Sequence, residues 1–251
     1  MFSMLADAAT ALSMQFLQEN VLESTTLYTF FVAMIAMGAG AAFFTLMLFR
    51  GDLESEHYTA VTVSSLICGI ACVNYAQMTE IYRSTGGDFP TAVRYIDWLL
   101  TTPLLLLSFP IVLGLGRESL KVYLQLLVLD VAMIVLAFVA EISPVGSRDW
   151  WLFFTLSCLC ELGILAVLFV SLREAIYEAP AELAAALQVT RMFVLIGWAV
   201  YPFGFLLALS GNGAPRELIY NVADVVNKVG FGLVLHSGIV ASLTGATWSR
   251  R

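Results

Sequence analysis

Long stretches without charge alternate with short polar segments along this chain. Three stretches contain no charged residue at all: 24–49, 58–79 and 192–215. Four more are as apolar but include one or two charged residues each: 89–116, 122–140, 150–172 and 218–248. A helix that crosses a membrane needs about 20 mostly apolar residues. The pattern therefore predicts an all-α membrane protein, a bundle of seven transmembrane helices.

The segments between these stretches are rich in glycine, proline and charge, which predicts short loops. With no internal repeat, we expect one bundle over residues 25–243, an N-terminal segment over 1–24 and a tail over 244–251. Residues 1–24 have no Lys or Arg ahead of their apolar positions, unlike a secretory signal peptide. We expect a short surface segment there, with an amphipathic surface helix lying over the first span as one form of it.

Lysine and arginine are unequally divided between the two sides of the predicted membrane. Three lie on one side (Arg83, Arg148 and Arg216) and seven on the other (Arg50, Arg117, Lys121, Arg173, Arg191, Arg250 and Arg251). Cytoplasmic loops carry the excess of these residues. The count predicts a multi-pass protein of the cell (plasma or inner) membrane, with its N-terminus extracellular and its C-terminus cytoplasmic.

Composition supports this class and excludes others. Charged residues make up 12% of the chain, about half the share in soluble domains, which is roughly 25%. The formal net charge of -7 argues against nucleic acid as a partner. The four cysteines lie in apolar stretches and have no metal-ligand spacing, so we expect small buried side chains and no metal site.

Ionisable residues inside the predicted spans are the candidates for function, because each costs a few kcal/mol in a membrane. They are Arg94, Asp97, Asp130, Glu161, Asp224, Lys228 and, near the end of the last span, His236. Arg94 and Asp97 are three residues apart, and Asp224 and Lys228 are four apart, so each pair shares a helix face. The four can form a neutral buried quartet.

Two interpretations of the quartet are open from the residues alone. It can fix helix packing, although buried ion pairs stabilise weakly. Alternatively, Lys228 is reactive, since a buried lysine can form a Schiff base with an aldehyde, with Asp97 and Asp224 as counter-ions. A long apolar aldehyde would be clamped by rings, and Trp98, Trp198, Tyr201 and Pro202 are candidates. A small-solute transporter with an intramembrane ion pair is the alternative class.

Three motifs carry a specific resemblance. RYIDWLLTTPLLLL, WAVYP and ELIYNVADVVNKVGFGL resemble the microbial (type I) rhodopsins, the proteorhodopsin branch most closely, over about residues 25–243. The resemblance implies all-trans-retinal covalently linked to Lys228, Asp97 as primary counter-ion and proton acceptor, Asp224 as second counter-ion, and Arg94 as the extracellular gate. It also implies a retinal pocket that includes Tyr95, Trp98, Leu105, Asp130, Met133, Trp198, Tyr201 and Pro202.

The third span departs from the proton-pump pattern. Pumps of this family carry acceptor, threonine and carboxylate donor; here the three positions are Asp97, Thr101 and Ser108. Asp97 and Ser108 are eleven residues apart, about 16 Å along one interior face. A hydroxyl relays protons but is no carboxylic-acid donor. The family's histidine partner of the acceptor is replaced by Asn74, and a carboxylate of the family's proton-release group by Arg216.

The resemblance implies a photoactive protein rather than an enzyme, and three mechanisms compete. The first is a light-driven outward proton pump that is reprotonated through water, Ser108 and His236, which lies eight residues past Lys228. The second is a slow sensory photoreceptor, which alone would need a transducer. The third, an inward proton pump, is disfavoured because YNVADVVNK retains Asp224. The lipid bilayer and a homo-oligomer (trimer or pentamer) are the expected partners, and Glu161 is expected to face a neighbouring protomer or lipid.

Overall fold

The computed structural model describes the chain over residues 2–49, 55–210 and 213–248. Its elements, in chain order, are α1 (Phe2–Leu48), α2 (Ser55–Thr85), α3 (Thr91–Val112), α4 (Arg117–Ile142), α5 (Arg148–Ala166), η1 (Val167–Ser171), α6 (Arg173–Glu178), α7 (Ala181–Met192), η2 (Phe193–Gly197), α8 (Val200–Leu206), η3 (Leu207–Ser210), α9 (Ala214–Val225), η4 (Val226–Gly230) and α10 (Phe231–Trp248). The described residues form no strand.

Seven stretches of the described residues are helical, long and apolar enough to cross a membrane, which confirms the predicted bundle. They are Val21–Leu48, His57–Thr85, Thr91–Val112, Arg117–Ile142, Arg148–Ser171, Ala181–Ser210 and Pro215–Thr244. The sixth begins eleven residues before the charge-free stretch that predicted it. The reason is that Arg191, expected in a loop, is buried within the bundle.

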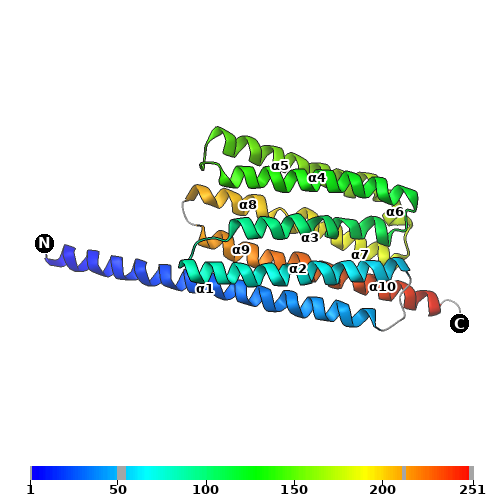
Figure 1. The fold of residues 1–251 in the computed structure, drawn as a ribbon, viewed down its shortest axis with the longest axis horizontal. Coiled ribbons are helices and arrows are strands. Elements are labelled where there is room, and N and C mark those ends of the chain that lie inside the picture. The colour runs from blue at the N-terminus through cyan, green and yellow to red at the C-terminus, as the bar shows by residue number, and fades with distance from the viewer. Residues whose placement is uncertain (1, 50–54, 211–212, 249–251) are drawn as a thin grey trace.

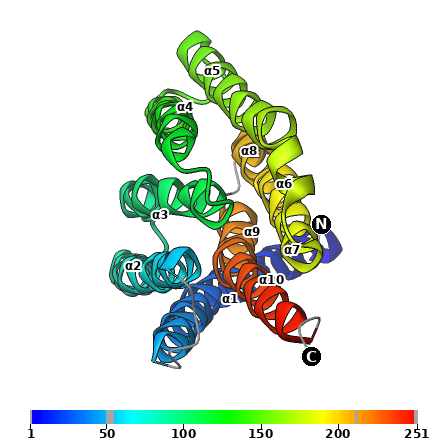
Figure 2. The same ribbon diagram turned by 90° about the vertical axis from the view of Figure 1, so that its right-hand side faces the viewer.

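The seven spans lie side by side along one direction (Figure 1). Viewed along the bundle, the first five follow one another in chain order, and the last span lies between α1 and α7 (Figure 2). The first described residues of α1 and the last described residues of α10 lie at opposite ends of the bundle, as an odd number of spans requires. The last span also reaches the third, because Lys228 of η4 contacts Asp97 of α3.

The N-terminal segment differs from the expected surface helix. Helix α1 runs without a break from Phe2 to Leu48, and its first half projects beyond the other helices (Figure 1). Residues 2–24 contain no glycine or proline, so nothing in the sequence ends the helix there. At the C-terminus a helix likewise extends past the predicted boundary of the bundle, because α10 continues to Trp248 through most of the predicted tail.

The sixth and seventh spans are interrupted helices. The backbone N–H of Trp198 donates to the carbonyl of Phe193 (3.1 Å), five residues back, so η2 is a π-helical turn. Pro202 has no N–H to offer the Trp198 carbonyl, which accepts from Tyr201 instead (2.9 Å). Segment η4 is also a π-helical turn, as is η1 at the end of the fifth span, and η4 contains Lys228. Such turns are frequent at functional sites.

The two interrupted spans pack closely through Gly197. Asn227 Nδ2 donates to the Gly197 carbonyl (3.0 Å), and a methyl group on Gly197 would collide with the Asn227 side chain. Only glycine permits this approach. Lys228 follows Asn227 directly, so this contact fixes the position of Lys228 along the bundle relative to the sixth span.

Candidate functional site

Lys228 lies between two carboxylates in the interior of the bundle. Its Nζ is 2.6 Å from Asp97 Oδ2, in α3, and 3.1 Å from Asp224 Oδ2, one turn earlier in the same span. All three side chains are buried. Arg94 is 3.6 Å from Asp224, so the structure brings the four residues of the predicted quartet into one chain of ion pairs.

The two carboxylates have different surroundings. Asp97 accepts one hydrogen bond besides that from Lys228, from Asn74 Nδ2 to Oδ1 (3.1 Å). Thr101 donates to the backbone carbonyl of Asp97 (2.8 Å) and not to its carboxylate. Asn74 therefore occupies the place beside the acceptor that the sequence assigned to it.

Asp224 is held by three uncharged donors. Tyr75 donates to Oδ2 (2.8 Å), while Tyr201 (2.6 Å) and Trp98 (3.1 Å) donate to Oδ1. Together with Lys228 and Arg94, these contacts stabilise the ionised form of Asp224 more strongly than that of Asp97. Of the two carboxylates, Asp224 thus has more hydrogen-bond donors to stabilise its negative charge than Asp97 has.

Arg94 connects this centre to a second group of charges at the end of the bundle where α3 and α9 begin. Its Nη2 donates to Glu217 (2.8 Å) and to Asn221 (2.7 Å), and Asn221 in turn donates to Thr29 (2.9 Å). Its Nη1 donates to the Tyr75 hydroxyl (3.2 Å), which is itself bonded to Asp224. Buried contacts thus run without a gap from Asp224 to Glu217.

Arg216 is part of this group and not a free loop residue. It pairs with Glu141 at the end of α4 (2.6 Å) and with Glu217 (3.3 Å). The arginine that replaces a family carboxylate is thus flanked by two carboxylates. The sequence pattern placed Glu141 and Glu217 in loops, because each lies at the end of an apolar stretch.

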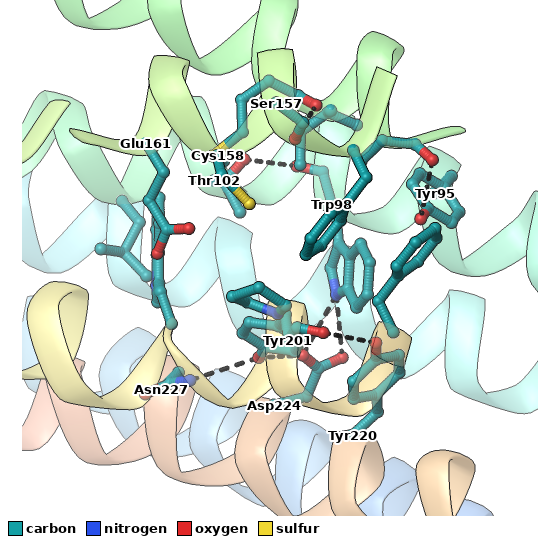
Figure 3. A pocket seen from close by; sticks show the side chains of 18 of the residues that line it. Tyr95, Trp98, Thr102, Ser157, Cys158, Glu161, Tyr201, Tyr220, Asp224 and Asn227 are labelled. Carbon is teal, nitrogen blue, oxygen red and sulfur yellow. Dashed lines mark hydrogen bonds between the residues drawn. The ribbon is translucent and has the colours of Figure 1, made fainter. Parts of the chain in front are cut away.

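A pocket opens beside Lys228, with about 740 Å³ of space including its mouth. All seven ring, proline and aliphatic residues predicted to line it do so: Tyr95, Trp98, Leu105, Met133, Trp198, Tyr201 and Pro202. Figure 3 shows Trp98, Tyr201 and Tyr220 gathered around Asp224. An amine at one wall of an apolar, ring-lined pocket fits a long apolar aldehyde such as retinal.

Asp130 lies behind this lining rather than in it. The Thr102 hydroxyl, which lines the pocket, is 2.8 Å from Asp130 Oδ2 and bridges α3 to α4. Ser157 of α5 donates to the backbone carbonyl of Met133 in α4 (2.8 Å). These two contacts fix the walls of the pocket on either side of α4.

The two residues predicted for reprotonation, Ser108 and His236, lie in α3 and α10. Ser108 is buried, and its Oγ lies 3.5 Å from the Leu104 carbonyl one turn earlier. His236, in α10, is half-buried and meets the Phe43 ring edge to face (5.8 Å between centroids). Ser108 thus faces the interior as expected, whereas the role of His236 stays a prediction.

One wall of the pocket was not predicted. Phe154, Ser157, Cys158 and Glu161 of α5 all line it. Their positions i, i+3, i+4 and i+7 share one helix face, which the sequence offered as a signal. Glu161 faces this pocket wall, so neither a neighbouring protomer nor lipid is needed to account for it.

Comparison with known proteins identifies relatives along the whole bundle. The family model described as "Bacteriorhodopsin-like protein" matches residues 24–242. The green-light absorbing proteorhodopsin of Gamma-proteobacterium EBAC31A08 is 32% identical over 224 residues, which cover 87% of this chain and 88% of the relative. The blue-light absorbing proteorhodopsin of Gamma-proteobacterium Hot 75m4 is 30% identical over 231 residues, covering 87% of both.

Solved structures agree with these matches. Exiguobacterium sibiricum rhodopsin is 37% identical with a TM-score of 0.78, over 89% of this chain and 98% of that chain. Xanthorhodopsin, described as a light-driven ion pump with dual chromophore, is 27% identical with a TM-score of 0.82, over 90% of this chain and 96% of that chain.

Proposed function

This chain belongs to the bacteriorhodopsin-like family of multi-pass membrane proteins, and from that premise we propose that it is a light-driven outward proton pump. The family implies retinal bound to a lysine, and we assign all-trans-retinal to Lys228. The observation that carries the proposal is the buried Lys228 Nζ between Asp97 and Asp224. When bound as a protonated Schiff base, retinal supplies light absorption and isomerisation.

The chain's own residues supply the acceptor. Asp97 Oδ2, 2.6 Å from Lys228 Nζ, is within reach of a proton held on that nitrogen. Asp224 is equally buried but has three uncharged donors and Arg94, so it remains the anion. A proton leaving Nζ therefore moves to Asp97, with Asn74 orienting the acceptor.

The exit path follows the contacts of Arg94. Arg94 pairs with Asp224 on its inner side (3.6 Å), and Glu217 and Asn221 bind its Nη2. Arg94 therefore links the inner carboxylates to the group at the end of the bundle. Glu217 and Glu141 share Arg216, so they provide the carboxylates that the sequence pattern lacked at position 216. We assign proton release on the extracellular side to this group.

The entry path is the unusual half. Without a carboxylate at position 108, Lys228 Nζ regains its proton through water ordered by Ser108, with His236 as the candidate relay toward the cytoplasm. This path predicts slow reprotonation. A slow photocycle is also typical of a sensory photoreceptor. The serine at position 108 is therefore the observation that favours this second candidate function.

The sign of the light-driven pH change tests the proposal. We expect a suspension of cells that express the protein with all-trans-retinal to acidify on illumination, and a protonophore to abolish the change. Lys228→Ala should show neither a visible band nor a pH change. Alkalinisation would indicate inward pumping, and a coloured protein without any pH change would indicate a sensor.

A further inference from the structure

Glu161 carries a half-buried carboxyl group that the proton path does not use. It lies in α5, in the middle of the fifth span, and lines the pocket together with Ser157 and Cys158 (Figure 3). An ionisable side chain at this depth costs a few kcal/mol. Its retention therefore calls for a physical role.

Glu161 differs from the other acidic residues of the interior in its contacts. Asp97, Asp130 and Asp224 each have hydrogen-bond partners. Within the part of the chain that the structure describes, no side chain or backbone group hydrogen-bonds or pairs with the Glu161 carboxyl. It does not fix the packing of α5, and it is available to whatever fills the pocket.

The position of Glu161 in the pocket indicates what it would meet. Figure 3 shows α5 on one side of the pocket and Asp224 and Asn227 on the opposite side. Both of these residues belong to the seventh span, which also carries Lys228. A long chromophore attached to Lys228 extends away from that span toward α5. This step rests on the proposed function, and it places Glu161 near the end of the chromophore remote from the attached nitrogen.

We propose that Glu161 sets the colour of the pigment as a charge at the remote end of the chromophore. Light moves positive charge in such a chromophore away from the nitrogen. An anion at Asp97 therefore stabilises the ground state, whereas an anion at Glu161 stabilises the excited state. The two carboxylates act on the absorption maximum with opposite signs.

Other titratable groups around the pocket must be separated from Glu161. Cys158 lies one turn earlier on the same helix, and Asp130 lies behind Thr102. Asp224, Lys228 and the tyrosines on the other walls line the pocket as well; these tyrosines are Tyr95, Tyr201 and Tyr220. The counter-ion Asp97 dominates any pH titration of colour, so it has to be removed first.

The experiment uses the retinal-reconstituted protein in an Asp97→Asn background, with spectra recorded from mildly acidic to alkaline pH. We expect a red shift as the pH rises and Glu161 ionises. Adding Glu161→Gln should abolish this shift and hold the maximum at the shorter wavelength, while Glu161→Asp should retain it. Cys158→Ser should leave it in place.

Leu162→Gln is the matched control, because it adds the same amide one residue along but on an exposed side chain. In the Asp97→Asn background, we expect Leu162→Gln to leave the pH-dependent red shift unchanged. A red shift that persists in Glu161→Gln, or that disappears in Cys158→Ser or Leu162→Gln, would overturn the assignment. If no visible band forms with retinal in any variant, the proposed function itself fails, which is a distinct result.

Discussion

The two carboxylates beside Lys228 are equally buried but are not equivalent in hydrogen bonding. Asp224 has three uncharged donors and Arg94, whereas Asp97 has Asn74 alone apart from their shared lysine. Hydrogen bonds to the charged form favour that form. The acceptor and the permanent counter-ion are therefore distinguished by their donors and not by their depth.

Asp97→Asn removes the acceptor charge closest to Lys228 Nζ. We expect absorption to shift to the red, because the anion no longer stabilises the ground state, and pumping to fall by about 100-fold or more, as when a general base is lost. Spectra and light-driven pH changes of the retinal-reconstituted protein measure both. Unchanged colour would contradict the counter-ion role of Asp97.

Tyr201→Phe tests how Asp224 is stabilised. The lost hydroxyl donates to a carboxylate (2.6 Å), so we expect the free energy of unfolding to fall by about 1.5–3 kcal/mol. Tyr220→Phe is the control, since its hydroxyl donates to the neutral Tyr201 carbonyl (2.7 Å) and its loss should cost about 1 kcal/mol. Denaturant titration compares the two, and equal losses would show that Asp224 gains nothing special from Tyr201.

Ser108→Asp supplies the carboxylic acid that the third span lacks. We expect Lys228 Nζ to regain its proton about 10-fold faster or more, since a positioned general acid accelerates such transfers at least that much. Recovery of visible absorption after a flash gives the rate. Ser108→Asn introduces a side chain as large as aspartate but without an acidic proton, so it should not accelerate the recovery. If neither variant accelerates it, reprotonation does not pass through position 108.

At this scale, the sequence predicted residues whose partners are close in the chain or recognisable by motif. Asp224 and Lys228 are four apart, and Trp98 is next to Asp97. Tyr75 was missed as a donor to Asp224, because 149 positions separate them and a lone tyrosine carries no pattern. Glu217 was missed because a carboxylate at the edge of an apolar stretch looks like a loop residue.

At the scale of elements, counting apolar stretches predicted all seven spans but not their irregularities. Hydropathy averages over many residues and is insensitive to a change from α-helical to π-helical hydrogen bonding. The π-helical turns η2 and η4 therefore appear only in the structure. Pro202 alone signalled an interruption, and it explains the lost hydrogen bond at Trp198.

Gly197→Ala tests the close packing of η2 on η4. The added methyl group would collide with Asn227, and we expect the site to lose about 1–3 kcal/mol, as in other overpacked interiors. Gly69→Ala in α2 is the matched control, since no atom lies within 4 Å of its new methyl group and helix propensity improves. Thermal bleaching of the pigment compares them, and equal midpoints would contradict the packing argument.

At the scale of the molecule, several ionisable groups lie inside the bundle while large apolar side chains face outward from the spans. Large hydrophobic residues are exposed on several spans, among them Val128, Val170 and Phe203. Arg191 and Arg216 are buried, so they no longer belong in the loop count that sets orientation. Without them, six Lys and Arg remain on the predicted cytoplasmic side and two on the other.

The corrected count makes orientation a sharper prediction than the original one. We expect a tag at the C-terminus to be inaccessible to an impermeant label or protease in intact cells and reactive after permeabilisation, and an N-terminal tag to behave oppositely. The same orientation places Glu217 and Glu141 outside, so release through the proposed exit group should acidify the medium on illumination. A C-terminal tag that reacts in intact cells would invert both assignments, because the exit group and the pumping direction depend on the same topology.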